Sequence, residues 1–192
     1  MKLSEDEIRY DFFTSFQRHS KLENHFISLE ATSPGFKSDF LKRRKVDTKI
    51  SWDNETIWLE FKYFRVPENS TKAYSQARGQ LLFDLYKLFN CLDFGACYFI
   101  SLSDEDFLRH LSKYNNGRYS FFNGNRVEED LLINSSFLHR EVNVARAQFR
   151  ERNWEVCLRQ RFGMKINGHH LGIYKLMKPL GSNITNKLLS HT

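Results

Sequence analysis

Helical periodicity marks two segments in the first half of the chain. Ser4 and Glu7 have the spacing of a capping box, and apolar residues then recur at Ile8, Phe12 and Phe16. From about residue 71 to residue 92 a second apolar stripe repeats at spacings of three and four, formed by Ala73, Ala77, Leu81, Leu85 and Leu88 and widened by Leu82 and Phe89. We expect an amphipathic helix in each segment.

Between these helices the chain alternates apolar and polar residues with the period of a strand. Residues 45–51 and 56–64 both alternate, and the turn-prone sequence Trp52-Asp53-Asn54-Glu55 separates them. The pattern predicts a β-hairpin. A short strand from His25 to Ala31 and a turn at Ser33-Pro34-Gly35 precede it.

The second half of the chain alternates strand and helix patterns. We expect a buried strand at Gly95–Leu102 and then a helix capped near Ser103 or Asp104. Further along we expect loops at 115–117 and 123–125, mostly helical structure in two pieces at 127–153, and late strands at Trp154–Lys165 and Gly172–Met177. The whole pattern predicts one α/β domain over residues 1–192 with a mixed central sheet.

The hairpin also brings two carboxylates together. If its turn is centred between Asp53 and Asn54, Asp47 lies six residues before Asp53 and Glu60 six residues after Asn54, so the two residues face each other. Their Cβ atoms would then be roughly 5 Å apart. Lys62 follows Glu60 by two residues and therefore shares its face.

Two like charges opposite each other destabilise a sheet unless a cation offsets their repulsion. A hard divalent ion held by both carboxylates is one solution, and a nearby lysine is another. A hairpin with mixed charges on a solvated face is the competing interpretation, and Asp47-Thr48-Lys49 shows that such tripeptides arise by chance. Trp58 and Phe64 share the face of Glu60, which favours a partly buried charge cluster.

The order of these elements and charges resembles the PD-(D/E)xK nuclease superfamily, which includes restriction endonucleases. The resemblance covers roughly residues 4–103 and rests on Asp47 in one strand and Glu60-Phe61-Lys62 in the next, between two helices. It implies a restriction-endonuclease-like αβββαβ core at about 4–103, helical and strand additions at about 104–180, and a tail at 181–192. One departure is Val46, where the family often has proline.

The resemblance implies a site for Mg²⁺, with Mn²⁺ as the alternative. Asp47 and Glu60 would be metal ligands, the main-chain carbonyl of Phe61 would add a third, and Lys62 would orient or activate the attacking water. A metal-dependent hydrolase of this kind needs no covalent nucleophile.

The two flanking helices supply further residues by the same resemblance. Glu7 matches an acidic metal ligand of the first helix, although its capping role explains it equally well. Gln80, or Gln76 one turn earlier, matches a polar residue that supports Lys62 or the substrate phosphate. Arg78 is a candidate for DNA contact, with an exposed helix arginine as the commoner explanation.

Basic residues gather in two places. Lys42, Arg43, Arg44 and Lys45 end two residues before Asp47, and we expect them to contact nucleic acid. A second set near the C-terminus is either a phosphate-tracking surface or a solvated face and comprises Arg140, Arg146, Arg150, Arg152, Arg159, Arg161 and Lys165.

Composition narrows the class of protein. The formal net charge of +6 suits a polyanionic partner without proving one. The chain has no secretory signal, no apolar stretch fit to span a membrane and only three cysteines, which fits the reducing cytoplasm. The adjacent His169 and His170 would point to opposite faces of a strand and are interpreted as surface residues rather than zinc ligands.

The sequence therefore predicts a cytoplasmic endonuclease that cuts nucleic acid, with DNA as the expected substrate and restriction or phage defence as the expected setting. Cutting both strands of a duplex normally needs two sites, which a homodimer would supply. The alternative is a nucleic-acid-binding protein, for example a DNA-binding one, that keeps the nuclease-like fold without catalysis. A third interpretation is a module whose basic helices bind a protein partner.

Overall fold

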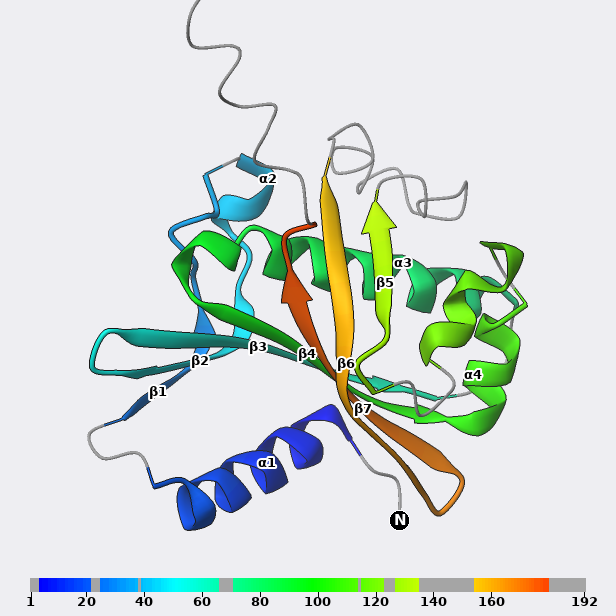
Figure 1. Cartoon of the computed structure of the whole chain (residues 1–192), viewed down its shortest axis with the longest axis horizontal. Coiled ribbons are helices and arrows are strands. Elements are labelled where there is room, and N and C mark those ends of the chain that lie inside the picture. Colours follow the sequence, from blue (N-terminus) through cyan, green and yellow to red (C-terminus); the bar gives the residue numbers. More distant parts are fainter. Residues whose placement is uncertain are drawn as a thin grey trace, which may run out of the picture.

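The computed structural model describes residues 4–21, 25–37, 39–65, 71–113, 115–122, 127–134 and 154–179. In this part of the chain seven strands form one mixed sheet, with helices on both of its faces (Figure 1). The predicted α/β class with a mixed, helix-flanked sheet is therefore confirmed.

The strands follow the predicted segments closely in the first half of the chain. They are β1 (Phe26–Ala31), β2 (Val46–Trp52), β3 (Glu55–Phe64), β4 (Ala96–Asp104), β5 (Asp130–Asn134), β6 (Glu155–Ile166) and β7 (His169–Met177). Their order across the sheet is β1-β2-β3-β4-β7-β6-β5. Among the described strands only β3 and β4 pair in parallel, and the described residues between them include helix α3 (Thr71–Phe89) and the short 3-10 helix η1 (Leu92–Phe94).

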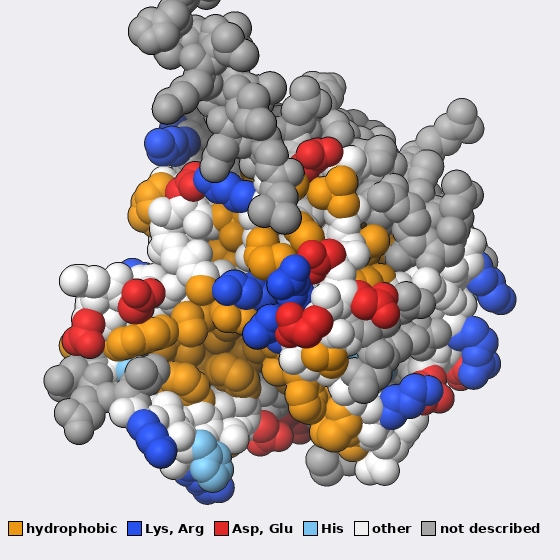
Figure 2. All heavy atoms as spheres, viewed as in Figure 1, with side chains coloured by type: hydrophobic (Ala, Val, Ile, Leu, Met, Phe, Trp, Pro, Cys, Tyr) orange, Lys and Arg blue, Asp and Glu red, His pale blue; other side chains and the backbone are white. Residues whose placement is uncertain are grey.

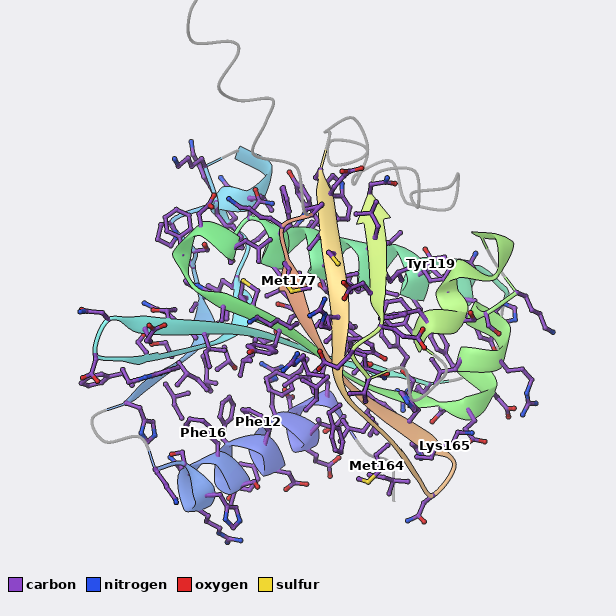
Figure 3. The ribbon with its side chains drawn as sticks, in the orientation of Figure 1. Phe12, Phe16, Tyr119, Met164, Lys165 and Met177 are labelled. Atoms are coloured by element: carbon purple, nitrogen blue, oxygen red, sulfur yellow. The ribbon has the colours of Figure 1, made fainter. Side chains whose placement is uncertain are left out.

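Helix α1 (Glu5–His19) covers one face of the sheet. Its capping box is present, with the Ser4 hydroxyl accepting from the main-chain N–H of Glu7. Phe12 and Phe16 point from α1 toward the strands (Figure 3), and the Phe12 ring lies 5.2 Å from the ring of Phe61. This contact is part of a small apolar cluster that joins α1 to β2, β3 and β4.

Helix α3 covers the opposite face and forms the larger core. Three leucines of the predicted stripe, Leu81, Leu85 and Leu88, are buried at 0–1% exposure. These residues belong to the same cluster as Trp58 and Phe64 of β3. Because side chains alternate along a strand, the side chains of Glu60 and Lys62 leave β3 on the face that α3 covers, as those of Trp58 and Phe64 do.

Three short elements complete the described fold. Helix α2 (Asp39–Lys42) lies between β1 and β2, α4 (Glu105–Leu111) begins after Asp104 as predicted, and the 3-10 helix η2 (Asn115–Phe122) follows. From α1 to β4 the helices and strands follow the order α1-β1-β2-β3-α3-β4, with α2 inserted between β1 and β2. None of the helices in the described ranges is long and apolar enough to cross a membrane.

Two predictions for the second half were wrong. Residues 130–134 form strand β5 rather than helix, because they pair with β6 and bury Ile133 in the core. The predicted loop at 115–117 opens a 3-10 helix whose last residues, Phe121 and Phe122, pack on Tyr174. The rest of the predicted helical segment, 135–153, and the predicted loop at 123–125 lie outside the described residues, as does the tail at 181–192.

Candidate active site

The β2–β3 hairpin has the predicted register. Trp52 pairs with Glu55 across the two-residue turn, and the ladder runs back to the pair Thr48 and Leu59. The next position in this register sets Asp47 against Glu60, where the main-chain N–H of Asp47 donates to Oε2 of Glu60 at 3.3 Å. The predicted placement of these two residues on adjacent antiparallel strands is confirmed.

The ladder between β2 and β3 ends at the pair Thr48 and Leu59, and β3 continues past it. We call this unpaired side of β3 its open edge. The N–H groups of Phe61 and Tyr63 point to this edge and donate to carboxylates instead of a strand: Phe61 to Oδ2 of Asp47 at 2.8 Å, and Tyr63 to Oε2 of Glu5 at 3.4 Å. In a strand the N–H and C=O of one residue point the same way. The Phe61 carbonyl therefore faces the same edge.

Glu60 is almost completely buried, with 3% of its surface exposed. Its Oε1 accepts from Nζ of Lys87 on α3, and that ammonium also lies 3.2 Å from Oδ1 of Asp84. Burial and the nearby Asp84 carboxylate raise the pKa of Glu60 well above its ordinary value, although Lys87 opposes that shift. Lys87 therefore offsets only part of the cost of placing a charged carboxylate here.

Lys62 lies between two acids from opposite faces of the sheet. Its Nζ is 3.2 Å from Oε2 of Glu5 on α1 and 3.9 Å from Oδ2 of Asp84 on α3. Burial alone lowers the pKa of Lys62, but Asp84 and Glu5 outweigh it and leave the pKa above its ordinary value. Lys62 is thus held as an ammonium.

Gln80 acts on this site through a neighbour. Its Nε2 donates to Oδ1 of Asp84 at 2.7 Å, so it orients the carboxylate that faces Lys62 and Lys87. The predicted support of Lys62 by Gln80 is therefore indirect in this structure. Gln76, one turn earlier, is exposed.

Asp47 completes the arrangement on the side of α1. Nη1 of Arg9 lies 4.0 Å from its Oδ1. Burial raises the pKa of Asp47, against the effects of the Phe61 N–H and of Lys87. We call the group at the open edge of β3 the edge cluster; its members are Glu5, Arg9, Asp47, Glu60, Lys62, Asp84 and Lys87.

The acid that α1 brings to the edge cluster is Glu5. Glu7 is exposed, and its carboxylate accepts from the main-chain N–H of Ser4 in the capping box. Two residues along a helix turn the side chain by about 200°, so Glu7 points away from the face that carries Glu5. The spacing of Glu5 with Ile8, Phe12 and Phe16 was the available signal, since these residues share one helical face.

Asp84 and Lys87 were missed by the sequence analysis, as were Glu5 and Arg9. Asp84 and Lys87 interrupt the stripe of Leu81, Leu85 and Leu88, and both are buried. A charged residue inside an apolar stripe is almost never buried unless it is paired, which was the signal available in the sequence.

The basic run before Asp47 lies at the surface. Lys42, Arg43, Arg44 and Lys45 are all exposed, and the Arg44 guanidinium lies 5.5 Å from the centre of the Phe83 ring. The carbonyl of Lys45 accepts from Lys87 at 3.2 Å, which ties this run to the edge cluster.

Arg78 is not the exposed helix residue that we expected. Only 4% of its surface is exposed, because it lies near His110 and Tyr119, where α4 and η2 cover α3. A direct contact between Arg78 and DNA is therefore inconsistent with this structure.

The C-terminal arginines that the structure describes are already paired with acids. Arg159 makes two hydrogen bonds to Asp130, at 2.7 and 2.8 Å, and Arg161 lies 2.7 Å from Glu128. Blue and red side chains gather over the middle of β6 in Figure 2. Lys165 pairs with Glu105. Arg140, Arg146, Arg150 and Arg152 lie outside the described residues.

The two adjacent histidines differ in environment. They alternate as expected for a strand, but His170 is 2% exposed and is not a surface residue, because it lies on the sheet face that carries Tyr174. His169 is partly exposed, with Nε2 2.8 Å from Oδ1 of Asp104 and 3.2 Å from the Tyr63 hydroxyl.

The donors at the open edge suit a hard cation. Asp47 and Glu60 supply carboxylate oxygens, and the Phe61 carbonyl faces the same edge. Among the described residues no group of three or more His, Cys, Asp or Glu has a metal-binding arrangement. Mg²⁺ is commonly held by only one or two carboxylates together with water, so this donor set fits it.

Comparison with protein-family models, curated proteins and solved structures found no match to this chain. Its function must therefore be inferred from its own residues.

Proposed function

We propose that this protein is a Mg²⁺-dependent endonuclease of the PD-(D/E)xK kind, with DNA as the expected substrate. The observation that carries the proposal is the convergence of Asp47, Glu60 and Lys62 at the open edge of β3. The hairpin register brings the two acids together, and the alternation of β3 brings the lysine beside them. The element order from α1 to β4 also agrees with this kind of nuclease.

The electrostatics of the edge cluster support a cation-binding role. Burial raises the pKa values of both Asp47 and Glu60, so placing their charges together has a cost in free energy. A buried cluster with perturbed pKa values is a candidate functional site, whereas paired surface charges seldom are. Such a cost in free energy is expected at a functional site, where the two acids would bind a cation.

A bound Mg²⁺ would lower the pKa of a water molecule and stabilise negative charge on the phosphoryl oxygens. Asp47 and Glu60 would hold the ion, with the Phe61 carbonyl beside them. Lys62 keeps 22% of its side chain exposed, enough to reach a substrate phosphate from the site. Its raised pKa favours an ammonium that orients the water and stabilises the phosphoryl charge over a neutral base.

The exposed run of Lys42, Arg43, Arg44 and Lys45 is the proposed surface for the phosphate backbone. The run ends two residues before Asp47, so a nucleic-acid strand lying on it would pass the edge cluster. Such contacts act on any sequence and weaken as salt rises. A homodimer would supply the second site needed to cut both strands, and restriction or phage defence is the proposed setting.

One observation favours a second candidate, a nucleic-acid-binding protein without catalysis. The ammonium of Lys87 already bonds to Glu60, so the carboxylates have an internal counterion. If that ion pair is permanent, the edge cluster only stabilises the fold. Nucleic acid would then bind to the basic run without being cut.

A cleavage assay separates the two candidates. The protein is incubated with Mg²⁺ or with EDTA and a panel of single-stranded, double-stranded, branched, methylated and unmethylated DNA, with RNA alongside. The nuclease proposal predicts cleavage of at least one substrate in Mg²⁺ and none in EDTA. Binding without cleavage in Mg²⁺ and in Mn²⁺ would support the second candidate.

A further inference from the structure

The ammonium of Lys87 lies in a setting that resembles a cation site. It contacts three oxygens: Oε1 of Glu60, Oδ1 of Asp84 at 3.2 Å, and the main-chain carbonyl of Lys45 at 3.2 Å. The ammonium donates hydrogen bonds to Glu60 and to the Lys45 carbonyl, and Asp84 pairs with it as an ion. The oxygens come from β3, α3 and the residue that precedes β2.

The surroundings of Lys87 explain why a lysine is stable there. Its side chain is 9% exposed, and its Nζ lies 5.9 Å from the centre of the Phe83 ring. Burial alone lowers the pKa of Lys87, but Asp84 and Glu60 raise it above its ordinary value. The group is therefore charged in spite of its burial.

We propose that Lys87 is the built-in cation of the edge cluster, a positioning residue that a divalent metal ion must displace from Glu60. This inference rests on the proposed metal site at Asp47 and Glu60. While Glu60 Oε1 accepts a hydrogen bond from Lys87, its affinity for a metal ion is lower than that of a free carboxylate oxygen. Once displaced, Lys87 keeps Asp84 as a partner, since that carboxylate lies on the same helix three residues earlier.

The proposal has two consequences. The edge cluster stays assembled without a metal ion, because Lys87 offsets the charge of Glu60. Metal binding exchanges one cation for another, so the affinity for the metal is lower than the two carboxylates alone would give. A purely structural lysine would produce the first consequence but not the second.

Metal affinity is therefore the deciding measurement. Mn²⁺ binding to the full chain is measured by calorimetry and by the electron paramagnetic resonance signal of free Mn²⁺, for wild type and for Lys87→Met. Methionine keeps much of the length of the side chain and removes its charge. We expect the variant to bind Mn²⁺ at least tenfold more tightly and to regain thermal stability when Mn²⁺ is added.

Lys49→Met is the matched control. Lys49 lies on β2, two residues from Asp47, and packs over Trp58 without contacting the carboxylates in any described interaction. This variant shows how much the affinity for Mn²⁺ changes when the lost positive charge is one that a metal ion does not have to displace. If Lys87→Met gains no more affinity than Lys49→Met, the inference is wrong although the metal site stands.

Two further outcomes keep the test decisive. If none of the proteins binds Mn²⁺, the proposed function and this inference both fail. If Lys87→Met does not fold, the charge-balanced double variant Lys87→Met/Asp84→Asn replaces it, with Asp84→Asn as its reference. The double variant must bind Mn²⁺ more tightly than Asp84→Asn, and equal binding would overturn the inference.

Discussion

Two groups of charged side chains lie on this sheet, and they differ in how deeply they are buried and in their balance of positive and negative charge. The group at β5 and β6 pairs Arg159 and Arg161 with Asp130 and Glu128 at the surface, and the Glu128 side chain is 52% exposed. The edge cluster buries Glu60, Asp84 and Lys87, with side-chain exposures of 4%, 1% and 9%. Exposed ion pairs contribute little to stability, whereas a buried charge is costly unless it is matched.

The balance of charge differs as well. The surface group has two arginines and two acids, and Arg159 binds Asp130 through two nitrogens. The edge cluster has four carboxylates and three cationic groups, and Oδ2 of Asp84 is buried without a hydrogen-bond partner among the described residues. Buried excess negative charge is what a cation-binding site requires, so of the two groups the edge cluster is the candidate for the proposed metal site.

Apart from the loss of a metal ligand, the largest effect on cleavage is expected from Lys62→Ala. In the proposed mechanism the ammonium acts on charge that develops in the transition state, so the variant should lose much more rate than affinity for substrate. Losses for a group of this kind are on the order of 10²–10⁴-fold. Single-turnover cleavage and thermal melting are measured on the same preparation.

Lys62→Arg is the companion variant and should rescue poorly, because the planar guanidinium has a different shape. Normal cleavage by Lys62→Ala with a lowered melting temperature would mean that Lys62 only neutralises Glu5 and Asp84. The proposed mechanism would then be wrong.

Loss of Lys87 should be the largest effect on stability. Removing one partner of a buried ion pair leaves the other charge uncompensated, which typically costs about 3–5 kcal/mol. Urea denaturation of Lys87→Met in EDTA measures this change in the free energy of unfolding. A change below about 1 kcal/mol is typical of exposed ion pairs. It would show that the ion pair of Lys87 contributes no more to stability than the ion pairs of the surface group.

A smaller effect is expected from the basic run. Neutralising Lys42, Arg43, Arg44 and Lys45 together to glutamine should weaken binding to all nucleic-acid sequences and flatten the salt dependence of binding. Fluorescence anisotropy across a range of salt concentrations measures both quantities. An unchanged salt slope would place the nucleic acid elsewhere.

The smallest effect is expected at the surface group. Arg159→Gln removes an exposed pair with Asp130, so cleavage and melting temperature should stay near those of wild type. The salt slope of binding should not change either. A flattened slope in this variant would show that the C-terminal arginines contact phosphate and that the two groups share one task.

The hairpin part of the site could be predicted because its constraints are local. A two-residue turn at Asp53 and Asn54 fixes the register, and the register places Asp47 against Glu60. The alternation of β3 then places Lys62. No knowledge of packing between distant elements was needed.

The remaining members of the edge cluster depend on how α1 and α3 dock on the sheet. Glu5 rather than Glu7 reaches Tyr63 and Lys62 because of the rotation of α1, which capping signals do not reveal. Asp84 and Lys87 belong to the edge cluster because they lie on the side of α3 that faces β3. Strand β5 was missed for a similar reason, since residues 130–134 take their conformation from pairing with β6.

The central claim is that Asp47 holds the metal ion that cleavage requires, and Asp47→Asn tests it most directly. Asparagine removes the charge but keeps an oxygen that can accept from the Phe61 N–H, so the fold should survive. Asp53→Asn, in the exposed hairpin turn, is the matched control. Cleavage of labelled DNA and RNA in Mg²⁺ is measured for both variants beside wild type. The account predicts that Asp47→Asn is inactive while Asp53→Asn cleaves like wild type, and full Mg²⁺-dependent cleavage by Asp47→Asn would contradict it.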